Sequence, residues 1–350
     1  MLLPKAHSTI SFRILRLLLC IPAVAGAQSK VATTAAQFLG ISVGPRPIAM
    51  GSAYVAQGND VSSLYWNPGA FVQAERTEIA FVNTEWLAGT KFRWFGFMLN
   101  LDKVNAFGLS LTQLDYGEEE VTTVDNPEGT GQRWAANDLA VALSYSRRLT
   151  DRFSIGGSAK FINQSIWNES ASGITFDVGL LFVTDFNNLR LGMSMSNFGG
   201  DLQLDGRDLL NRIDIDPANP GSNKTLVGKL KTDPWPTPLL FRVGVAMDVF
   251  QTDFGKASIA IDALRPNDFK ETVNVGAEVS WQDLLFVRAG YKGLFANDKV
   301  LDKNTQQEGL AFGVGIHYRV EGIAALRVDY ANNQFSLFGN LNTIALTVGF

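Results

Sequence analysis

From about residue 77 to its last residue, the chain repeats one unit of roughly ten residues in which apolar and polar side chains alternate. Segments 174–182 and 310–318, for example, carry Ile, Phe, Val and Leu on one parity, and mainly glycine or polar and charged residues on the other. Because side chains of a strand point alternately to its two faces, each unit has one apolar and one polar face. No segment keeps the helical period over a comparable span. The repeat restricts the chain to an antiparallel all-β fold, either a soluble sandwich or a barrel.

The lengths of the connections distinguish a barrel from a sandwich. Every second connection is short and the intervening ones are long, such as 115–134, 199–236 and 293–308, with one short exception at 88–90. Short turns at one end and long loops at the other are typical of bacterial outer-membrane barrels, which also prefer an even number of strands. The sequence predicts a transmembrane antiparallel β-barrel over residues 77–350, with about fourteen strands near residues 77–87, 91–101, 104–114, 135–148, 152–165, 172–184, 188–198, 237–249, 256–266, 272–282, 284–292, 309–319, 323–330 and 341–350.

The amino terminus has the pattern of a secretory signal. A basic stretch precedes the apolar run 17–25, and Ala-Gly-Ala at residues 25–27 has the small-x-small form of a cleavage site. A membrane anchor is the alternative, but about ten apolar residues are too few to span a bilayer comfortably. Lipidation of Cys20 is a second alternative, although the residue before it is not small. We predict that residues 1–27 are a signal peptide that is removed.

Composition excludes several classes of function. The chain has a formal net charge of -4, and its predicted signal peptide carries basic but no acidic residues, so the processed chain is more acidic still. No basic surplus is available to neutralise phosphates, which argues against a nucleic-acid partner. Cys20 is the only cysteine and would leave with the signal peptide. Disulfides and thiol nucleophiles are therefore not expected in the processed chain.

Residues 28–76 show no sustained strand pattern and are rich in alanine, glycine and serine. Two stretches in it, RPIAMGSAY at 46–54 and DVSSLYWNPGA at 60–70, resemble the N-terminal signature of the PorV/PorQ family of outer-membrane proteins, which are similar in fold to the FadL fatty-acid channel. This resemblance implies a hatch inside a fourteen-stranded barrel. Ser52 and the order Gly69-Ala70 depart from the usual family pattern. The motif residues, which we interpret as mainly architectural because turns alone explain glycine and Asn-Pro, are Arg46, Met50, Gly51, Asp60, Trp66, Asn67 and Pro68.

The inward parity of the predicted strands carries acids and bases together. Interleaved charges can pair across neighbouring strands and hold a hatch, whereas unpaired charges in a narrow lumen would be costly. A charged conduction path is the functional alternative. The predicted lumen network comprises Asp177, Arg242, Asp248, Asp262, Glu278, Arg288, Arg327 and Asp329, with Lys160, Lys292 and Arg319 on the same parity.

Aromatic residues near the strand ends fit the girdles that anchor a barrel at the two interfaces, although some could stack on sugars. The residues assigned to these girdles are Trp86, Trp94, Tyr145, Trp281, Tyr291, Tyr318 and Tyr330. The last strand ends on Phe350 itself, which resembles the signal read by the barrel-assembly machinery of the outer membrane. We predict that deleting Phe350 impairs assembly.

The sequence offers little support for catalysis, and we predict no catalytic, cofactor or metal site. His317 is the only histidine outside the predicted signal peptide, and the G-x-S-x-G match at residues 40–44, centred on Ser42, is meaningful only at a strand-to-helix elbow. A lipase using Ser42 and His317 is nevertheless conceivable. The 199–236 connection contains the acidic cluster Asp201, Asp205, Asp208, Asp214 and Asp216, whose spacing does not match the EF-hand template for calcium. Apolar residues in the same connection make it the best candidate for an interaction surface.

Two functions from different classes follow. The resemblance to PorV implies a non-catalytic component of type IX secretion and surface attachment, with secreted cargo C-terminal domains or sortase-like attachment subunits as partners, beside outer-membrane lipid. The alternative is a FadL-like channel for hydrophobic small molecules. A channel needs an apolar internal pocket, yet the inward parity reads as charged or glycine-rich. The sequence therefore favours the binding component.

Overall fold

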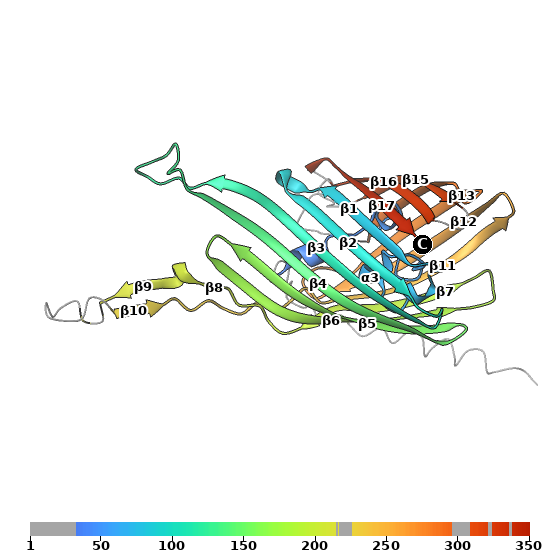
Figure 1. The fold of residues 1–350 in the computed structure, drawn as a ribbon, viewed down its shortest axis with the longest axis horizontal. Helices are drawn as coiled ribbons and strands as arrows, with labels where there is room; N and C mark the ends of the chain where they lie inside the picture. Colours follow the sequence, from blue (N-terminus) through green and yellow to red (C-terminus); the bar gives the residue numbers. More distant parts are fainter. Residues whose placement is uncertain (1–32, 215, 217–225, 296–308, 321–323, 336–337) are drawn as a thin grey trace, which may run out of the picture. The chain divides into compact units, whose positions relative to one another are not determined.

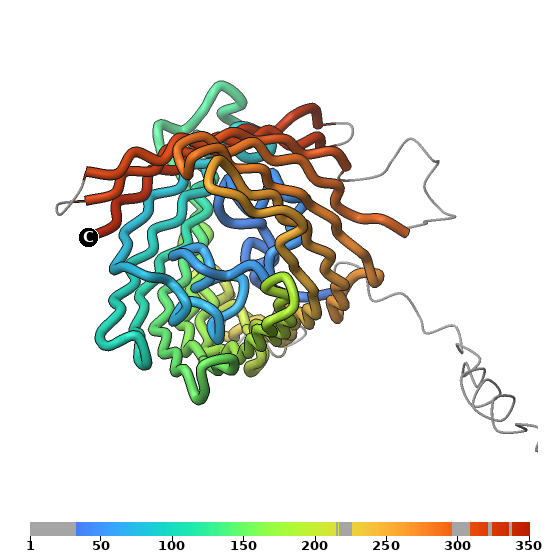
Figure 2. Tube along the Cα trace, turned by 90° about the vertical axis from the view of Figure 1, so that its right-hand side faces the viewer, coloured from blue at the N-terminus to red at the C-terminus, as the bar shows by residue number. Residues whose placement is uncertain are grey.

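The computed structural model describes residues 33–214, 216, 226–295, 309–320, 324–335 and 338–350. Fourteen long strands form one antiparallel sheet in the order β5-β4-β3-β2-β1-β17-β16-β15-β14-β13-β12-β11-β7-β6, and the pairing of β5 with β6 closes it (Figure 1 and Figure 2). The predicted all-β barrel is confirmed. The predicted signal peptide, residues 1–27, and most of the 293–308 connection lie outside the described residues.

Each predicted barrel strand is present, with bounds close to those expected. The barrel strands are β1 (Glu78–Glu85), β2 (Lys91–Asn100), β3 (Asn105–Glu120), β4 (Arg133–Thr150), β5 (Phe153–Ile166), β6 (Glu169–Val183), β7 (Arg190–Gly199), β11 (Leu240–Thr252), β12 (Gly255–Pro266), β13 (Thr272–Trp281), β14 (Leu285–Leu294), β15 (Leu310–Val320), β16 (Ala324–Gln334) and β17 (Asn340–Gly349). The short elements are η1 (Gln37–Gly40), α2 (Pro45–Ala49), α3 (Ser63–Trp66), η2 (Phe71–Gln73), η3 (Leu87–Gly89), β8 (Asp205–Gly206), η4 (Arg207–Leu209), β9 (Leu210–Ile213) and β10 (Leu226–Lys229).

The two ends of the barrel differ in their connections. We name the end with the connections 101–104 and 151–152 the turn end, and the end with the connections 121–132 and 200–239 the loop end. Two loop-end expectations are corrected. The predicted 115–134 loop is shorter than expected, because β3 continues to Glu120, β4 starts at Arg133, and the two strands pair again after a bulge at Asp115/Glu118. The connection 167–168 between β5 and β6 and the connection 267–271 between β12 and β13 are also short.

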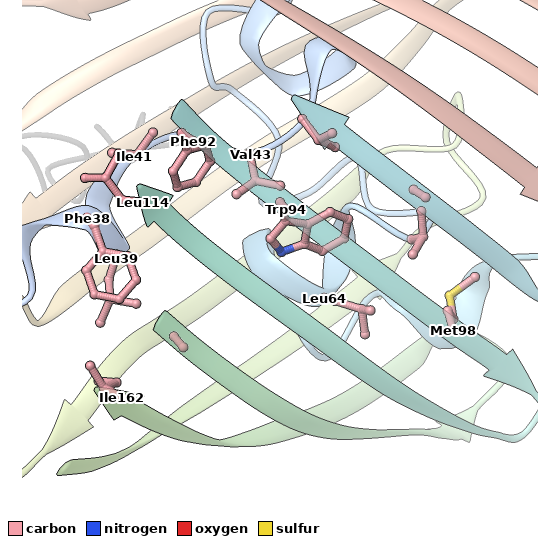
Figure 3. Packing of buried hydrophobic residues seen from close by; sticks show 14 of the residues in the cluster. Phe38, Leu39, Ile41, Val43, Leu64, Phe92, Trp94, Met98, Leu114 and Ile162 are labelled. Carbon is pink, nitrogen blue, oxygen red and sulfur yellow. The ribbon is translucent and has the colours of Figure 1, made fainter. Parts of the chain in front are cut away.

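The outer face of the barrel is apolar. On β15, Phe312 and Val314 are 54% and 53% exposed, whereas the intervening Ala311 is 2% exposed. The same alternation recurs around the sheet, as expected for strands with one face toward lipid. Among the described residues no helix is long and apolar enough to cross a membrane. The girdle assignment of Trp94 was wrong, because this side chain is 2% exposed and points into the barrel (Figure 3).

The interior of the barrel is filled by the segment before β1. Figure 2 shows this segment, in blue, inside the ring of strands. Phe38, Leu39 and Leu64 of this segment belong to one buried apolar cluster with Phe92 and Trp94 of β2 (Figure 3). The sequence suggested that the inward parity is charged or glycine-rich throughout. The structure shows that it is not. On β2 it carries Phe92, Trp94 and Met98 and is apolar.

Candidate functional site: the hatch and its seat in the barrel

We refer to residues 34–74 as the hatch segment. Its backbone folds into short helical turns. Gly44, with a φ of 87°, directly precedes the α2 helix, and Pro45 is the first residue of this helix. The indole of Trp66 donates from Nε1 to the carbonyl oxygen of Val43 at 2.9 Å, which joins the two halves of the segment. The hatch segment is thus a folded unit with its own internal contacts.

Glycines of the barrel wall allow the backbone of the hatch segment to approach the strands closely. Gly51 has a φ of 62°, and a Cβ added to it would lie 2.5 Å from the amide nitrogen of Tyr291. Gly276 and Gly290 face Met50 and Gly51 so closely that a Cβ on either would overlap the hatch backbone. The glycines on the inward parity of these strands are therefore seats for the hatch segment, since only glycine leaves this space free.

Six buried charged side chains form a closed ring of ion pairs at the junction. Arg46 bonds Asp60 at 2.9 Å and Glu278 at 2.8 Å, and Arg288 bonds Glu278 at 2.6 Å and Asp329 at 2.5 Å. Arg327 completes the circuit, with contacts of 3.2 Å to Asp329 and 3.5 Å to Asp60. We call this set the ion ring. The hatch segment supplies Arg46 and Asp60, and β13, β14 and β16 supply the other four.

The ion ring contains three arginines and three acids, so its formal charges cancel. The carboxyl groups are deeply buried: Asp60 is 1% and Asp329 2% exposed. Charges taken out of water are tolerated only when partners satisfy them, and removal of one member leaves its partners uncompensated. Arg46 approaches Glu278 with both Nε and Nη2, which is the bidentate geometry that fixes orientation as well as distance. The ring therefore specifies one position of the hatch segment.

The ion ring also sets the ionisation of hatch residues. Burial alone would raise the pKa of Asp60, but the charges of Arg327 and Arg46 outweigh it and lower this pKa below its ordinary 3.8. Burial raises the pKa of Tyr54 well above its ordinary 10.0, and the Arg46 charge offsets only part of this effect. The Tyr54 hydroxyl stays protonated and donates to Asp60 at 2.7 Å. At neutral pH Asp60 is therefore a carboxylate that accepts hydrogen bonds from the Tyr54 hydroxyl and the Arg46 guanidinium.

The remaining predicted lumen charges fall into separate groups and do not form one network. Asp262 accepts hydrogen bonds from the backbone amides of Tyr54 and Val55 at 2.6 and 2.8 Å, so it clamps the turn of the hatch segment that follows Gly51. Arg242 stacks on the ring of Trp66, with its guanidinium carbon 5.1 Å from the ring centroid. Both contacts hold the hatch segment against β11 and β12.

Asp177 and Asp248 support the wall away from the ion ring. Asp177 pairs with Lys160 at 3.0 Å and accepts from the amide of Asn197, a residue with a φ of 63° in a bulge of β7. Asp248 pairs with Arg190 at 3.0 Å and with Lys256 at 2.8 Å, next to the turn end. These groups tie neighbouring strands together, as the parity of the sequence indicated.

Asn67 and Pro68 serve as an anchor on the opposite wall. The side-chain amide of Asn67 donates to the carbonyl oxygens of Val55 and Leu180 at 2.7 and 2.9 Å, and its oxygen accepts from the amide of Gly69 at 3.0 Å. All three of its polar contacts are to backbone, so the side chain joins hatch turns to β6. Every motif residue singled out in the sequence thus contacts either the barrel or another part of the hatch segment.

The hypothetical pair of Ser42 and His317 is not assembled. His317 is half-buried and lines a cavity of about 420 Å³ together with the ion ring residues Arg46, Glu278 and Arg327. Ser42 lines a different cavity of about 20 Å³, which is about the size of one water molecule. Two side chains reach the Ser42 Oγ: Lys292, whose Nζ donates to it at 3.1 Å, and Ser52, whose Oγ lies 3.1 Å away. A cavity of this size leaves no room for an ester or amide substrate beside the Ser42 hydroxyl.

The loop end carries an apolar groove of about 730 Å³ that the sequence did not reveal as one feature. We name it the loop-end groove. Tyr116 and Trp134 of the extended β3 and β4 form one wall, and Leu204 and Trp235 of the connection 200–239 form another. Leu202 and Trp235 hold this connection in place by exchanging two backbone hydrogen bonds of 2.8 Å. Residues from the extended strands β3 and β4 and from the connection 200–239 thus meet in one groove.

Metal binding has no structural support among the residues that the structure describes. No group of three or more His, Cys, Asp or Glu side chains in them is arranged to hold a metal ion. In the aspartate-rich connection, Asp205 pairs with Lys229 at 2.5 Å and Asp208 accepts from Asn168 at 2.8 Å. These two aspartates are engaged in local contacts at the loop end.

Comparisons with solved structures agree with this architecture. The structure of the CymD monoaromatic hydrocarbon channel is 13% identical and gives a TM-score of 0.55, with 88% of this chain and 96% of that chain covered. The Ralstonia pickettii toluene transporter TbuX is 11% identical over 88% of this chain and 97% of its own, with a TM-score of 0.50. The Pseudomonas putida toluene transporter TodX is 13% identical over 87% and 96%, also with a TM-score of 0.50. At these identities the likeness establishes the barrel fold alone.

Comparison at the level of sequence families identifies the chain. No curated protein matches it. The family model of the type IX secretion system protein PorV matches residues 24–213, which include the hatch segment and the strands β1 to β7. The family and the barrel fold together indicate an outer-membrane protein. The hatch motif, its seat in a fourteen-stranded barrel and this match agree, and the chain belongs to the PorV family of type IX secretion system proteins.

Proposed function

We propose that this protein is a non-catalytic, hatch-closed barrel of type IX secretion, which binds secreted cargo or attachment subunits at its loop end. The observation that carries the proposal is the seating of the hatch segment. A segment held by the buried ion ring, by the Asp262 clamp and by an apolar cluster fills the lumen. A filled lumen favours work on the outer surface over transport through the barrel, since displacing the hatch segment would break all of these contacts.

The loop-end groove is the proposed binding surface. Short turns of outer-membrane barrels face the periplasm and long loops face outward, so this groove opens toward the cell surface, where secreted proteins arrive. Trp134 and Trp235 line it, and aromatic side chains of this kind are typical anchors of protein interfaces. The exposed Leu226 and Val227 of β10 extend the apolar surface along the same connection.

Affinity capture from intact outer membranes tests the proposal. The unmodified protein is expected to recover cargo C-terminal domains or sortase-like attachment subunits. Trp134→Glu places a charge in the groove and should abolish this recovery, whereas Val124→Glu, at a 99% exposed position on the connection between the same two strands, should retain it. Equal recovery by the two variants would refute the groove as the binding surface, and recovery of neither partner class by the unmodified protein would refute the secretion role.

A channel for hydrophobic small molecules is the second candidate. The shared fold with hydrocarbon channels and the apolar lining of the loop-end groove favour it. Toluene added to the purified protein would then quench or shift the fluorescence of the groove tryptophans and would cross liposomes that contain the protein. Binding without any flux would leave the secretion role as the better account.

Two assignments remain predictions within this proposal. Cleavage after Ala27 is checked by N-terminal sequencing of the protein from the outer membrane. Phe350 donates its amide hydrogen to the carbonyl oxygen of Thr77 at 2.9 Å, and its side chain is 60% exposed. An exposed terminal ring is free to be read by the barrel-assembly machinery, so the protein without Phe350 should accumulate uninserted, with a loss of heat-modifiable migration in electrophoresis.

A further inference from the structure

The outer wall formed by β3, β4, β5 and β6 carries a second apolar groove of about 750 Å³, on the face of the wall that points away from the hatch segment. Its floor consists of Gly157 and Ala159, two outward residues of β5. Strand register places Tyr145 and Leu143 on one side of this floor and Val178 and Phe176 on the other. Small residues between two rows of large ones thus leave a trough on a surface that otherwise carries large side chains. We call it the wall groove.

The position of the wall groove identifies what covers it. Its walls are exposed apolar side chains, with Leu143 66%, Phe176 51% and Val178 47% exposed. They belong to the parity that faces hydrocarbon all around the barrel, so acyl chains of the membrane are the surrounding solvent. A trough one strand wide between rows of large side chains matches the shape of an extended acyl chain.

The turn end of the wall groove carries a cation. Arg147 is the next outward residue of β4 after Tyr145 and pairs in register with Asn105 of β3 and Ile155 of β5. It is exposed, and it lies near Asp102 of the adjacent turn, whose pKa is lowered chiefly by hydrogen bonds from Asn105 and Val104 and least by the Arg147 charge. The oxygens of Asp102 already accept hydrogen bonds from Val104 and Asn105 at 2.6 to 3.0 Å. The Arg147 guanidinium thus remains available to an anion outside the barrel.

The Tyr145 ring joins the apolar and charged parts. It packs on Phe107 with ring centroids 5.1 Å apart, and its hydroxyl donates to the side-chain oxygen of Asn105 at 2.7 Å. The ring body therefore lines the apolar groove and its polar tip marks the level at which water and headgroups begin. An anion bound to Arg147 would lie at this level, which is the headgroup level of the periplasmic leaflet because short turns face the periplasm.

We propose that the wall groove binds one glycerophospholipid of the periplasmic leaflet, with an acyl chain over Gly157 and Ala159 and the phosphate at Arg147. Apolar contact along the trough and charge attraction at its end act on the same molecule. The proposal is independent of the secretion role, because it involves neither the loop-end groove nor the hatch segment.

Native mass spectrometry of the full-length protein, reconstituted with dioleoyl phosphatidylglycerol and released from detergent, tests the proposal. Ala159→Leu fills the trough and should weaken lipid retention about tenfold, the effect of excluding a few buried methylenes. Ala277→Leu is the matched control, because Ala277 is an exposed residue on the lipid-facing parity of β13. It should retain the lipid as the unmodified protein does.

The charged end is tested separately, which keeps the proposal open to refutation should Ala159→Leu fail to insert. Arg147→Gln should weaken retention about fivefold, the effect of one basic residue at an anionic lipid surface. Arg319→Gln, at another exposed arginine near the turn end, should not. Dioleoylglycerol, which has the same chains without the phosphate, should be retained about fivefold less than the phospholipid by the unmodified protein. Retention that is equal for Ala159→Leu and Ala277→Leu, or indifferent to both Arg147 and the phosphate, would overturn the proposal.

Discussion

The two sides of the lumen hold the same hatch segment by different means. Against β1 to β5 the contact is apolar: Leu64 and Phe71 of the hatch segment pack with Trp94, Met98 and other inward residues. Against β11 to β16 the apolar contacts are with the small side chains of Ala246, Ala260 and Ala331, and the segment is also held by glycine seats, the Asp262 clamp and the ion ring. Apolar packing contributes stability without strong direction, whereas buried ion pairs tolerate one geometry only. One side therefore retains the segment and the other side fixes its position.

The largest effect is expected on the polar side. Glu278→Ala leaves Arg46 and Arg288 without their shared carboxylate in a buried site, and should lower the free energy of unfolding by about 3–5 kcal/mol. Urea unfolding in detergent micelles, followed by tryptophan fluorescence, measures this loss. The control Glu271→Ala breaks an ion pair of 3.5 Å with Arg265 whose side chains are 69% and 76% exposed, and should cost at most about 1 kcal/mol. Similar losses for both variants would mean that the ion ring does not stabilise the fold.

The apolar side should respond with a somewhat smaller loss. Leu64 is 2% exposed and packs over Gly108 of β3, so Leu64→Ala should cost about 2–4 kcal/mol through lost contact and a residual cavity. The matched control Leu143→Ala removes a side chain that is 66% exposed on the lipid face, and should cost less than about 1 kcal/mol. The same urea experiment applies. An unchanged urea midpoint for Leu64→Ala would show that apolar packing of the hatch segment does not contribute to stability.

A glycine seat should give an intermediate to small effect. Gly51→Ala brings a Cβ to within 2.5 Å of the Tyr291 amide nitrogen at a φ of 62°, so the hatch segment must shift or strain, at a cost of about 1–3 kcal/mol. Gly89→Ala is a control with a similar φ of 76° and open space around its added Cβ. Because Gly89→Ala introduces backbone strain without steric overlap, the difference between the two variants measures the effect of the overlap alone. A Gly51→Ala protein as stable as Gly89→Ala would show that the seat is not tight.

The smallest effect is expected from acid. The pKa of Asp60 is below its ordinary 3.8 in the folded protein, so its contribution to stability is fully present above that value and is lost as the pH falls through the folded pKa. Asp60→Asn should be less stable at neutral pH, and the difference in unfolding midpoint between the unmodified protein and Asp60→Asn isolates the Asp60 contribution. This difference should be constant from pH 7 to 5 and should shrink below about pH 4. A difference that grows as the pH drops would contradict the charged state assigned to Asp60.

The contrast also explains which features the sequence could predict. Strands such as β13 and β15 alternate strictly, so period and parity identified both the barrel and the buried Glu278, Arg288 and Asp329. Arg46 and Asp60 were identified through a family motif, but their entry into the ion ring depends on the path of the hatch segment through the lumen. No local pattern encodes that path.

The apolar side was harder to predict for a different reason. On β2, large apolar side chains occupy both parities: Trp94 and Met98 point inward, while Phe95 and Phe97 point outward. Alternation of hydrophobicity therefore does not indicate which face of β2 is internal. For this reason the sequence suggested a girdle position for Trp94. The path of the connection 200–239 was likewise not predictable from local sequence, because its residues Leu202 and Trp235 are paired by tertiary contacts.

Amide hydrogen exchange of the intact protein in detergent micelles tests the central claim most directly, namely that the hatch segment is fixed inside the barrel. The amides of residues 45–71 should exchange as slowly as those of the strands β13 to β16, and Glu278→Ala should accelerate exchange around Arg46 and Asp60 before it affects the strands. Exchange of residues 45–71 in the unmodified protein at the rate of an unstructured chain would contradict the account.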